Sequence, residues 1–251
     1  MIPFEMVEPA SLQEALTMLD PQEPTIRPVA GGTALMLMMK AGVFRPTRLV
    51  SLHRLEPEHA RIAMKDSGEM RIGALAHGDP HMDLPPVLAS LAARVSITGP
   101  HGTREVLLAE LYTGYYETVL DRNELITAVS VPPLGERKAA YVKVTARSAD
   151  DWPALGIAVS FLLNDGVVHD PVVVVSAATE KVTRLSGAER ALHGGRLDDQ
   201  ALSHAGDAAA NEAVLLTDAH GSAAYKRELL RVHLGRAMRQ AADRSARVHQ
   251  P

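Results

Sequence analysis

The sequence contains no cysteine among its 251 residues. Without thiols the chain can form no disulfide bond, offers no thiolate nucleophile and supplies no ligand to an iron–sulfur cluster. Any iron–sulfur cluster that works with this protein must therefore be bound by another polypeptide.

The sequence also lacks an excess of charge of one sign and any long apolar run. Its formal net charge is -4, with acidic and basic residues interspersed, so there is no strong field for nucleic acid or anionic lipid. No apolar stretch approaches the length of a membrane span, and residues 1–5 lack a basic region followed by an apolar one. We therefore expect a cytoplasmic protein. Hydrophobic residues make up 46% of the chain, enough for two modest domains or one large one.

The most informative stretch is residues 26–40, where a short apolar run breaks at two glycines and resumes as a helix. Gly31 and Gly32 lack side chains and can adopt positive φ, so a ligand can approach the backbone closely. The amides of Gly32, Thr33 and Ala34 would point outward at the start of the helix. Unpaired N–H groups and the helix dipole favour an anion there, such as a phosphate or a diphosphate. The alternative is a plain corner between a strand and a helix.

The N-terminal half predicts an α+β arrangement. Ser11 and Glu14 form a capping box in which the Ser11 hydroxyl accepts from the Glu14 amide and the Glu14 carboxylate reaches back to the Ser11 amide. Residues 48–52 predict a strand parallel to the one before the glycine turn, which gives a βαβ unit. Antiparallel hairpins and one further strand are expected beyond it, at 60–65 with 70–74, 95–97 with 103–107, and 125–131.

The polar segment 134–138 indicates a domain boundary near residue 137. The predicted domains are therefore 1–137 and 138–251. The second is expected to hold three antiparallel strands followed by helices. The strands are predicted at 140–145, 154–163 and 167–176, and the helices at about 186–193, at about 197–213 and from 222 onward.

A polar, proline-rich loop at residues 76–86 concentrates imidazoles and carboxylates. Four of them follow each other at every second position and could ligate a metal ion in a hydrolase, namely His77, Asp79, His81 and Asp83. Gly78 and Pro80 argue against a regular strand there, and a solvated turn is the alternative.

The order of the predicted elements and several short sequence segments resemble those of the FAD-binding medium subunit of the molybdenum hydroxylases. That family includes the flavoprotein subunits of aerobic carbon monoxide dehydrogenase and xanthine dehydrogenase. The resemblance covers almost the whole chain, and its clearest segments are Phe4, 9–19, 27–40, 141–143, 164–166 and 221–225. It implies an N-terminal FAD-binding domain of the vanillyl-alcohol-oxidase type, here truncated, followed by a three-stranded antiparallel sheet with a helix bundle.

The resemblance also implies which residues bind the cofactor. One segment matches the family's first flavin loop, which wraps the FAD diphosphate, and consists of Val29, Ala30, Gly31, Gly32, Thr33, Ala34 and Leu35. Asp83 matches an aspartate that contacts the cofactor, and Ile126 and Lys143 match positions near the isoalloxazine ring. On pattern alone, Lys143 could equally be a strand residue that faces solvent.

The chain departs from the family at residues 75–77. Relatives carry there a helical stretch and a second glycine loop, which encloses the other side of the diphosphate. Here the strand that ends near Leu75 runs directly into His77 and Gly78. Losing several backbone hydrogen bonds to a charged phosphate, at roughly 1.5–3 kcal/mol each, would weaken FAD binding by orders of magnitude.

Two functions are compatible with this resemblance. The first is an oxidoreductase subunit without catalytic residues of its own, in which FAD takes electrons from iron–sulfur clusters on a partner and passes them to an external acceptor. Its implied partners are a large subunit with the molybdenum cofactor and a small subunit with [2Fe–2S] clusters, in a hetero-oligomer. The second is a cofactor-deficient subunit retained for assembly, which the missing loop favours.

Overall fold

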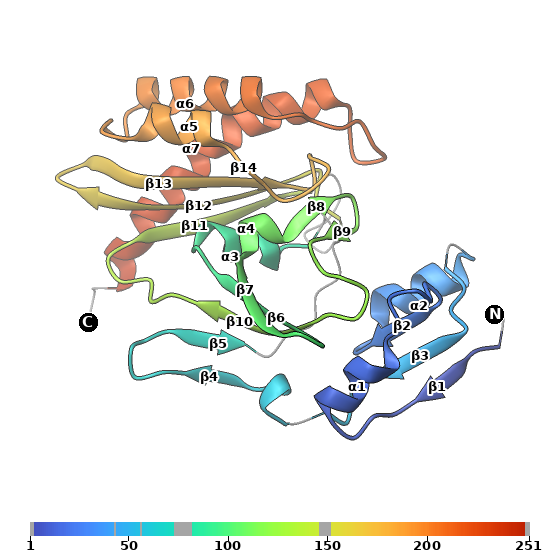
Figure 1. The fold of residues 1–251 in the computed structure, drawn as a ribbon. Coiled ribbons are helices and arrows are strands. Elements are labelled where there is room, and N and C mark those ends of the chain that lie inside the picture. Colours follow the sequence, from blue (N-terminus) through green and yellow to red (C-terminus); the bar gives the residue numbers. More distant parts are fainter. Residues whose placement is uncertain (1–2, 43, 56, 73–81, 146–151, 249–251) are drawn as a thin grey trace. The chain divides into compact units, whose positions relative to one another are not determined.

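The computed structural model describes residues 3–42, 44–55, 57–72, 82–145 and 152–248 (Figure 1). The chain forms two compact units, each assembled from separate stretches of sequence. Unit 1 consists of Met1–Ala76, Arg94–Val106 and Val119–Ser130, and unit 2 consists of His77–Ala93, Leu107–Thr118 and Val131–Pro251. The last passage from unit 1 to unit 2 falls between Ser130 and Val131, while the domain boundary at residue 137 stays a prediction.

The first part of unit 1 is a three-stranded parallel sheet in the order β1-β3-β2, with two helices. Its elements in chain order are β1 (Glu5–Val7), α1 (Leu12–Met18), β2 (Ile26–Val29), α2 (Thr33–Lys40) and β3 (Arg48–Ser51). β2 precedes α2 in the chain and β3 follows it, and the two strands pair in parallel, which confirms the predicted βαβ unit. Ala15 and Leu16 of α1 join Val50 of β3 in a small buried cluster.

The start of α1 confirms one half of the capping box and corrects the other. The Ser11 hydroxyl accepts a hydrogen bond from the Glu14 amide at 3.2 Å, as predicted. Glu14 Oε2, however, accepts from the amide of Ala10 at 2.7 Å, not from the amide of Ser11. Ser11 itself is extended (φ -146°, ψ 159°), as is usual for an N-cap residue.

The second part of unit 1 is a five-stranded sheet in the order β4-β5-β10-β6-β7. A short 3₁₀ helix, η1 (Pro57–Ala60), precedes it. Its strands are β4 (Ile62–Met64), β5 (Met70–Ile72), β6 (Arg94–Gly99), β7 (Gly102–Leu107) and β10 (Leu125–Val131). β4 pairs antiparallel with β5, and β10 with β6. A parallel βαβ unit followed by antiparallel strands confirms the α+β class. The predicted shortening at residues 75–77 lies outside the described residues.

Unit 2 is built on a four-stranded antiparallel sheet in the order β11-β12-β13-β14. Its strands are β11 (Lys138–Val144), β12 (Leu155–Asn164), β13 (Val167–Ser176) and β14 (Thr183–Arg184), and its other elements are α3 (Leu84–Ser90), α4 (Leu108–Leu111), β8 (Tyr112–Gly114), β9 (Glu117–Thr118), α5 (Ser186–Leu192), α6 (Asp199–Glu212) and α7 (Ala223–Val248). The expectation of three strands was wrong. A strand of two residues is too short to show the alternation by which strands are predicted.

The side chains of the long strand β12 alternate in size, so the two faces of the sheet pack against different helices. Leu155, Ile157 and Phe161 belong to the large core that also contains residues of α5, α6 and α7. The intervening residues are small, and the Ser160 hydroxyl donates to the carbonyl oxygen of Ser90, in α3, at 2.6 Å. Side chains that alternate along a strand point to opposite faces of the sheet. The small-residue face therefore receives α3, and the other face receives the three C-terminal helices (Figure 1).

Two helical glycines offer a test of how closely α6 and α7 pack. A Cβ at Gly206 in α6 would overlap the carbonyl oxygen of Arg231 in α7. We expect Gly206→Ala to lower the free energy of unfolding by about 1–3 kcal/mol, since the backbone of α7 cannot move aside without a cost. Urea unfolding followed by circular dichroism would measure the change.

The matched control is Gly235→Ala in α7. Its Cβ would meet Leu202 at 3.5 Å, an ordinary van der Waals distance. Alanine should therefore stabilise this helix by about 0.5–1 kcal/mol, because it is the better helix former. Equal effects at the two positions would contradict the packing described here.

Candidate functional site

The predicted glycine turn lies in unit 1, between the end of β2 and the start of α2. Gly32 has a positive φ of 73°, and its carbonyl oxygen accepts the hydrogen bond from the Met36 amide at 2.8 Å. The amides of Thr33, Ala34 and Leu35 therefore come before the first hydrogen bond of the helix. They lie at the end of α2 where the helix dipole is positive, which is the environment that an anion prefers.

Space around the turn suits a ligand that approaches the backbone. Ala30 and Gly31 are exposed. A Cβ at Gly31 would meet nothing within 4 Å, whereas one at Gly32 would touch Met36 and Val29 at 3.6 Å each. The missing side chain of Gly31 thus leaves open space, while Gly32 is needed for its backbone conformation. Amide donors, a helix N-terminus and this open space together fit a diphosphate.

The second group of predicted residues lies in unit 2. Asp83 immediately precedes α3, and Lys143 lies on β11. The Lys143 ammonium donates to Asp83 Oδ2 at 3.0 Å, and the hydroxyl of Tyr141 donates to Asp83 Oδ1 at 2.7 Å. The Asp83 carboxylate makes no side-chain bond to the N-terminus of α3, although Asp83 is the N-cap residue. Two predicted site residues are therefore brought together, with Tyr141 as their common neighbour.

Tyr141 was not among the predicted site residues. Two sequence signals could have found it: Tyr141 belongs to segment 141–143 of the family resemblance, and it lies two positions before Lys143, which places both side chains on the same face of β11. Burial, and next the hydrogen bond to Asp83, raise the pKa of Tyr141 well above its ordinary value of 10. The hydroxyl therefore remains protonated and acts as a donor. The Lys143 side chain is only 26% exposed, so it does not simply face solvent.

Gly156 makes room for this cluster. It pairs with Lys143 on β11 and with Ser176 on β13, so the three residues form a row across the sheet. A Cβ at Gly156 would lie 2.5 Å from Ser176 Oγ and 2.7 Å from the Tyr141 hydroxyl oxygen. Only glycine leaves both hydroxyl groups where they are.

Behind Ser176, the chain is held by an ion pair between a buried lysine and a partly exposed aspartate. Lys226 in α7 is fully buried, and its ammonium donates to Asp218 Oδ2 at 2.6 Å and to the carbonyl oxygen of Ala177 at 3.4 Å. Ala177 has a positive φ of 63°, a conformation that an alanine rarely adopts. The Lys226 ammonium thus fixes the strained residue that follows Ser176.

Ile126, the remaining predicted residue, lies in unit 1 on β10. It is 3% exposed and pairs with Ile97 beside a register shift in the sheet. Its contact with a flavin ring stays a prediction, as do the ligand assignments of the other predicted residues.

The metal-site alternative depends on residues that are mostly not described. His77, Asp79 and His81 lie outside the described residues, and Asp83 is bound by Tyr141 and Lys143. Within the described part of the chain, no group of three or more His, Cys, Asp or Glu residues could hold a metal ion. Among the same residues, no helix is both long enough and apolar enough to cross a membrane.

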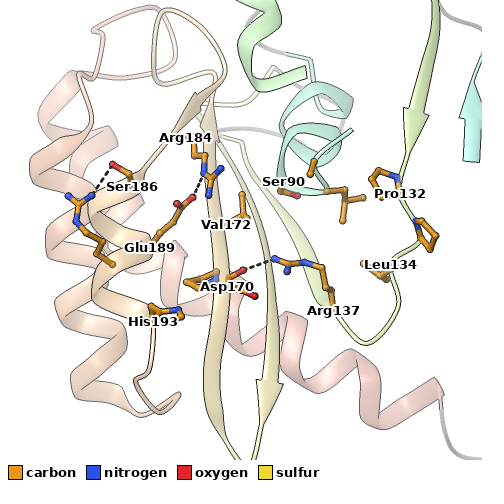
Figure 2. Close-up of a pocket in the computed structure, with 15 residues that line it drawn as sticks. Ser90, Pro132, Leu134, Arg137, Asp170, Val172, Arg184, Ser186, Glu189 and His193 are labelled. Atoms are coloured by element: carbon orange, nitrogen blue, oxygen red, sulfur yellow. Dashed lines mark hydrogen bonds and ion pairs between the residues drawn. The ribbon is translucent and has the colours of Figure 1, made fainter. Parts of the chain in front are cut away.

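Unit 2 also contains a cavity of about 540 Å³, and none of the predicted site residues line it (Figure 2). It follows β13, between α5 and the segment that precedes β11. The Arg137 guanidinium donates to the carbonyl oxygen of Asp170 at 2.6 Å, and Glu189 accepts from the Val173 amide at 3.0 Å and from Arg184 at 2.7 Å. These bonds satisfy groups along the strand edge, so the residues serve the sheet itself.

Comparison with known proteins places the chain in a family. Residues 2–77 and 72–134 match the FAD binding domain in molybdopterin dehydrogenase, and residues 140–241 match the CO dehydrogenase flavoprotein C-terminal domain. These matches define a flavoprotein subunit of oxidoreductase complexes. The chain belongs to the FAD-binding medium subunits of the molybdenum hydroxylases, the carbon monoxide dehydrogenase family.

Individual relatives match along their whole length. The chain is 26% identical to the glyceraldehyde dehydrogenase medium chain of Sulfolobus acidocaldarius, over 95% of this chain and 98% of that one. It is also 26% identical to the carbon monoxide dehydrogenase medium chain of Hydrogenophaga pseudoflava, over 98% of this chain and 100% of that one. A solved structure of carbon monoxide dehydrogenase from Hydrogenophaga pseudoflava, which lacks the Mo-pyranopterin moiety, has a TM-score of 0.91 at 27% identity, over 97% of this chain and 99% of that one.

The alignments also bear on the departure at residues 75–77. The alignment to the Sulfolobus protein is 278 positions long and this chain has 251 residues, so at least 27 positions have no counterpart here. The match to the FAD-binding domain breaks into two parts that overlap at residues 72–77. The break coincides with the predicted location of the missing segment.

The ion pair between Lys226 and Asp218 predicts a pH dependence of stability. Burial by itself would raise the pKa of Asp218. The hydrogen bond from Lys226, then the hydrogen bond from the His220 amide, and then the charges of Lys226 and His220 outweigh burial and lower this pKa below its ordinary value of 3.8. Because the folded state has the lower pKa, Asp218 adds stability above pH 3.8 that is lost as the pH falls through the folded-state pKa. We expect Asp218→Asn to remove this loss in urea unfolding between pH 5 and pH 2.5.

At pH 7 the same substitution should cost about 1–3 kcal/mol, since the buried Lys226 ammonium loses its carboxylate partner. The control is Asp199→Asn, because Asp199 is 97% exposed in its ion pair with Arg239 and should contribute little. If Asp218→Asn loses as much unfolding free energy between pH 5 and pH 2.5 as the wild type does, Asp218 is not the group responsible for that loss.

Proposed function

We propose that this chain binds FAD and passes electrons from iron–sulfur clusters of a partner subunit to an external acceptor. Family membership supports this, and so does the absence of cysteine, since the clusters must then be bound elsewhere. The observation that carries the proposal is the turn between β2 and α2, with its amide donors and the open space at Gly31. Bound FAD would supply the ability to accept and release electrons.

In this proposal the residues of the turn hold the diphosphate through their backbone. They are Val29, Ala30, Gly31, Gly32, Thr33, Ala34 and Leu35. Asp83 contacts the cofactor, and Ile126 and Lys143 lie near the isoalloxazine ring. An ammonium group at Lys143 would favour negative charge on the reduced ring, and the neighbouring Asp83 carboxylate holds that ammonium in place.

The proposed partners follow from the same family. They are a large subunit that carries the molybdenum cofactor and a small subunit that carries [2Fe–2S] clusters.

The proposed domain boundary near residue 137 lies in the gap between the two family matches, which end at 134 and resume at 140. The location of the protein in the cytoplasm stays a prediction.

A second candidate is a cofactor-deficient subunit retained for assembly of the same complex. The break in the match to the FAD-binding domain at residues 72–77 favours it, because that is where the family resemblance implies the second glycine loop. Without that loop, only one side of the diphosphate has backbone donors.

Titration of the purified protein with FAD, followed by quenching of flavin fluorescence, separates the two candidates. The flavoprotein predicts saturable binding in the micromolar range or tighter, together with flavin absorption bands in the visible spectrum. The assembly subunit predicts no saturation at any accessible concentration, and that result would overturn the proposal.

The substitution Gly31→Ala tests the turn itself. The added methyl group meets no protein atom within 4 Å, so stability should not change, but it occupies the space proposed for the diphosphate. Losing one or two backbone hydrogen bonds to phosphate, at about 1.5–3 kcal/mol each, should weaken FAD binding about tenfold or more. The measurement is the same titration.

Gly235→Ala in α7 serves as the control, because it makes the same chemical change on a helix that the proposal does not use. Unaltered FAD affinity in Gly31→Ala, with affinity for the cofactor intact in the wild type, would show that the diphosphate is bound elsewhere.

A further inference from the structure

The Asp83 carboxylate is divided between two donors, one on each oxygen. Tyr141 donates to Oδ1 at 2.7 Å and Lys143 donates to Oδ2 at 3.0 Å. Asp83 is also the N-cap residue of α3, but the second and third residues of this helix are Pro85 and Pro86, which have no amide hydrogen to donate to the carboxylate. The orientation of this carboxylate is therefore set by β11 and not by its own helix.

Tyr141 contacts the sheet through both its ring and its hydroxyl group. Its aromatic ring lies across Gly156, where Cε2 would be 3.3 Å from an added Cβ, and its hydroxyl lies beside the buried Ser176 hydroxyl. By contrast, the side chain of Asp83 is 47% exposed and that of Lys143 is 26% exposed. Tyr141 thus connects the interior of the sheet to the exposed carboxylate of Asp83.

We propose that Tyr141 is a positioning residue: by holding Asp83 Oδ1 it directs Oδ2 to Lys143 and so fixes the ammonium group at the flavin. This rests on the proposed function, since Lys143 acts on the ring only if FAD binds. Tyr141 itself need not touch the cofactor. Without its hydroxyl, Asp83 Oδ1 loses the donor that fixes it, the half-exposed carboxylate is free to rotate into solvent, and Lys143 is released.

The first test needs no flavin. The reaction of Lys143 with acetic anhydride, followed by peptide mass spectrometry, reports how tightly its ammonium is held, with Lys138 on the same strand as internal reference. We expect Tyr141→Phe to raise the relative rate several-fold, toward the value of Asp83→Asn, in which the anionic partner is gone. An unchanged rate in Tyr141→Phe would overturn the proposal.

The second test uses FAD affinity in a double-mutant cycle. Tyr141→Phe should weaken binding about three- to tenfold in the wild-type background and have no effect in the Lys143→Met background, because the hydroxyl acts through Lys143. A loss that is the same in both backgrounds would assign Tyr141 a purely structural role and overturn the proposal. The matched control is Tyr112→Phe, which removes another buried hydroxyl in unit 2.

The two tests separate this proposal from the function on which it rests. If the wild type binds no FAD, the proposed function fails and the flavin part of this inference fails with it, whatever the acetylation rates show. If the wild type binds FAD and the two readouts do not respond to Tyr141→Phe, only the role of Tyr141 fails. Circular dichroism of each variant would identify one that does not fold, and Asp83→Asn then tests the release of Lys143 independently.

Discussion

The close approach of α3 to the small-residue face of β12 is the constraint on which the candidate site of unit 2 depends. Glycine, alanine and serine alternate with large residues along this strand, and the Ser160 hydroxyl bonds directly to the end of α3. Because α3 lies so near the sheet, the residue before it, Asp83, comes within hydrogen-bonding distance of Tyr141 and Lys143. A larger residue at Gly156 would displace the Tyr141 ring and Ser176 together.

Unit 1 meets a different physical requirement. A diphosphate needs hydrogen-bond donors more than it needs side chains, and a turn between a strand and a helix supplies them from the backbone alone. Gly32 gives the turn its shape through a positive φ, and Gly31 leaves it open. The two adjacent glycines therefore have separate roles.

The shortening expected at residues 75–77 bears directly on cofactor binding. The alignment to the Sulfolobus protein contains positions that this chain lacks, and the match to the FAD-binding domain is interrupted at residues 72–77. The first loop and the Asp83 cluster are both present despite that loss. The balance between them and the missing donors decides between a flavoprotein and an assembly subunit, because each phosphate hydrogen bond changes affinity about tenfold or more.

The sequence by itself determined the βαβ unit, the hairpins, the α+β class and the family, because strand, turn and helix signals are carried by short windows of residues. It also singled out Asp83 and Lys143 separately. Only the tertiary structure decided that these two residues meet, that Tyr141 joins them and that a fourth strand completes the sheet. Those features depend on strand register and on the distance between a helix and a sheet, which contacts between residues some 60 positions apart establish.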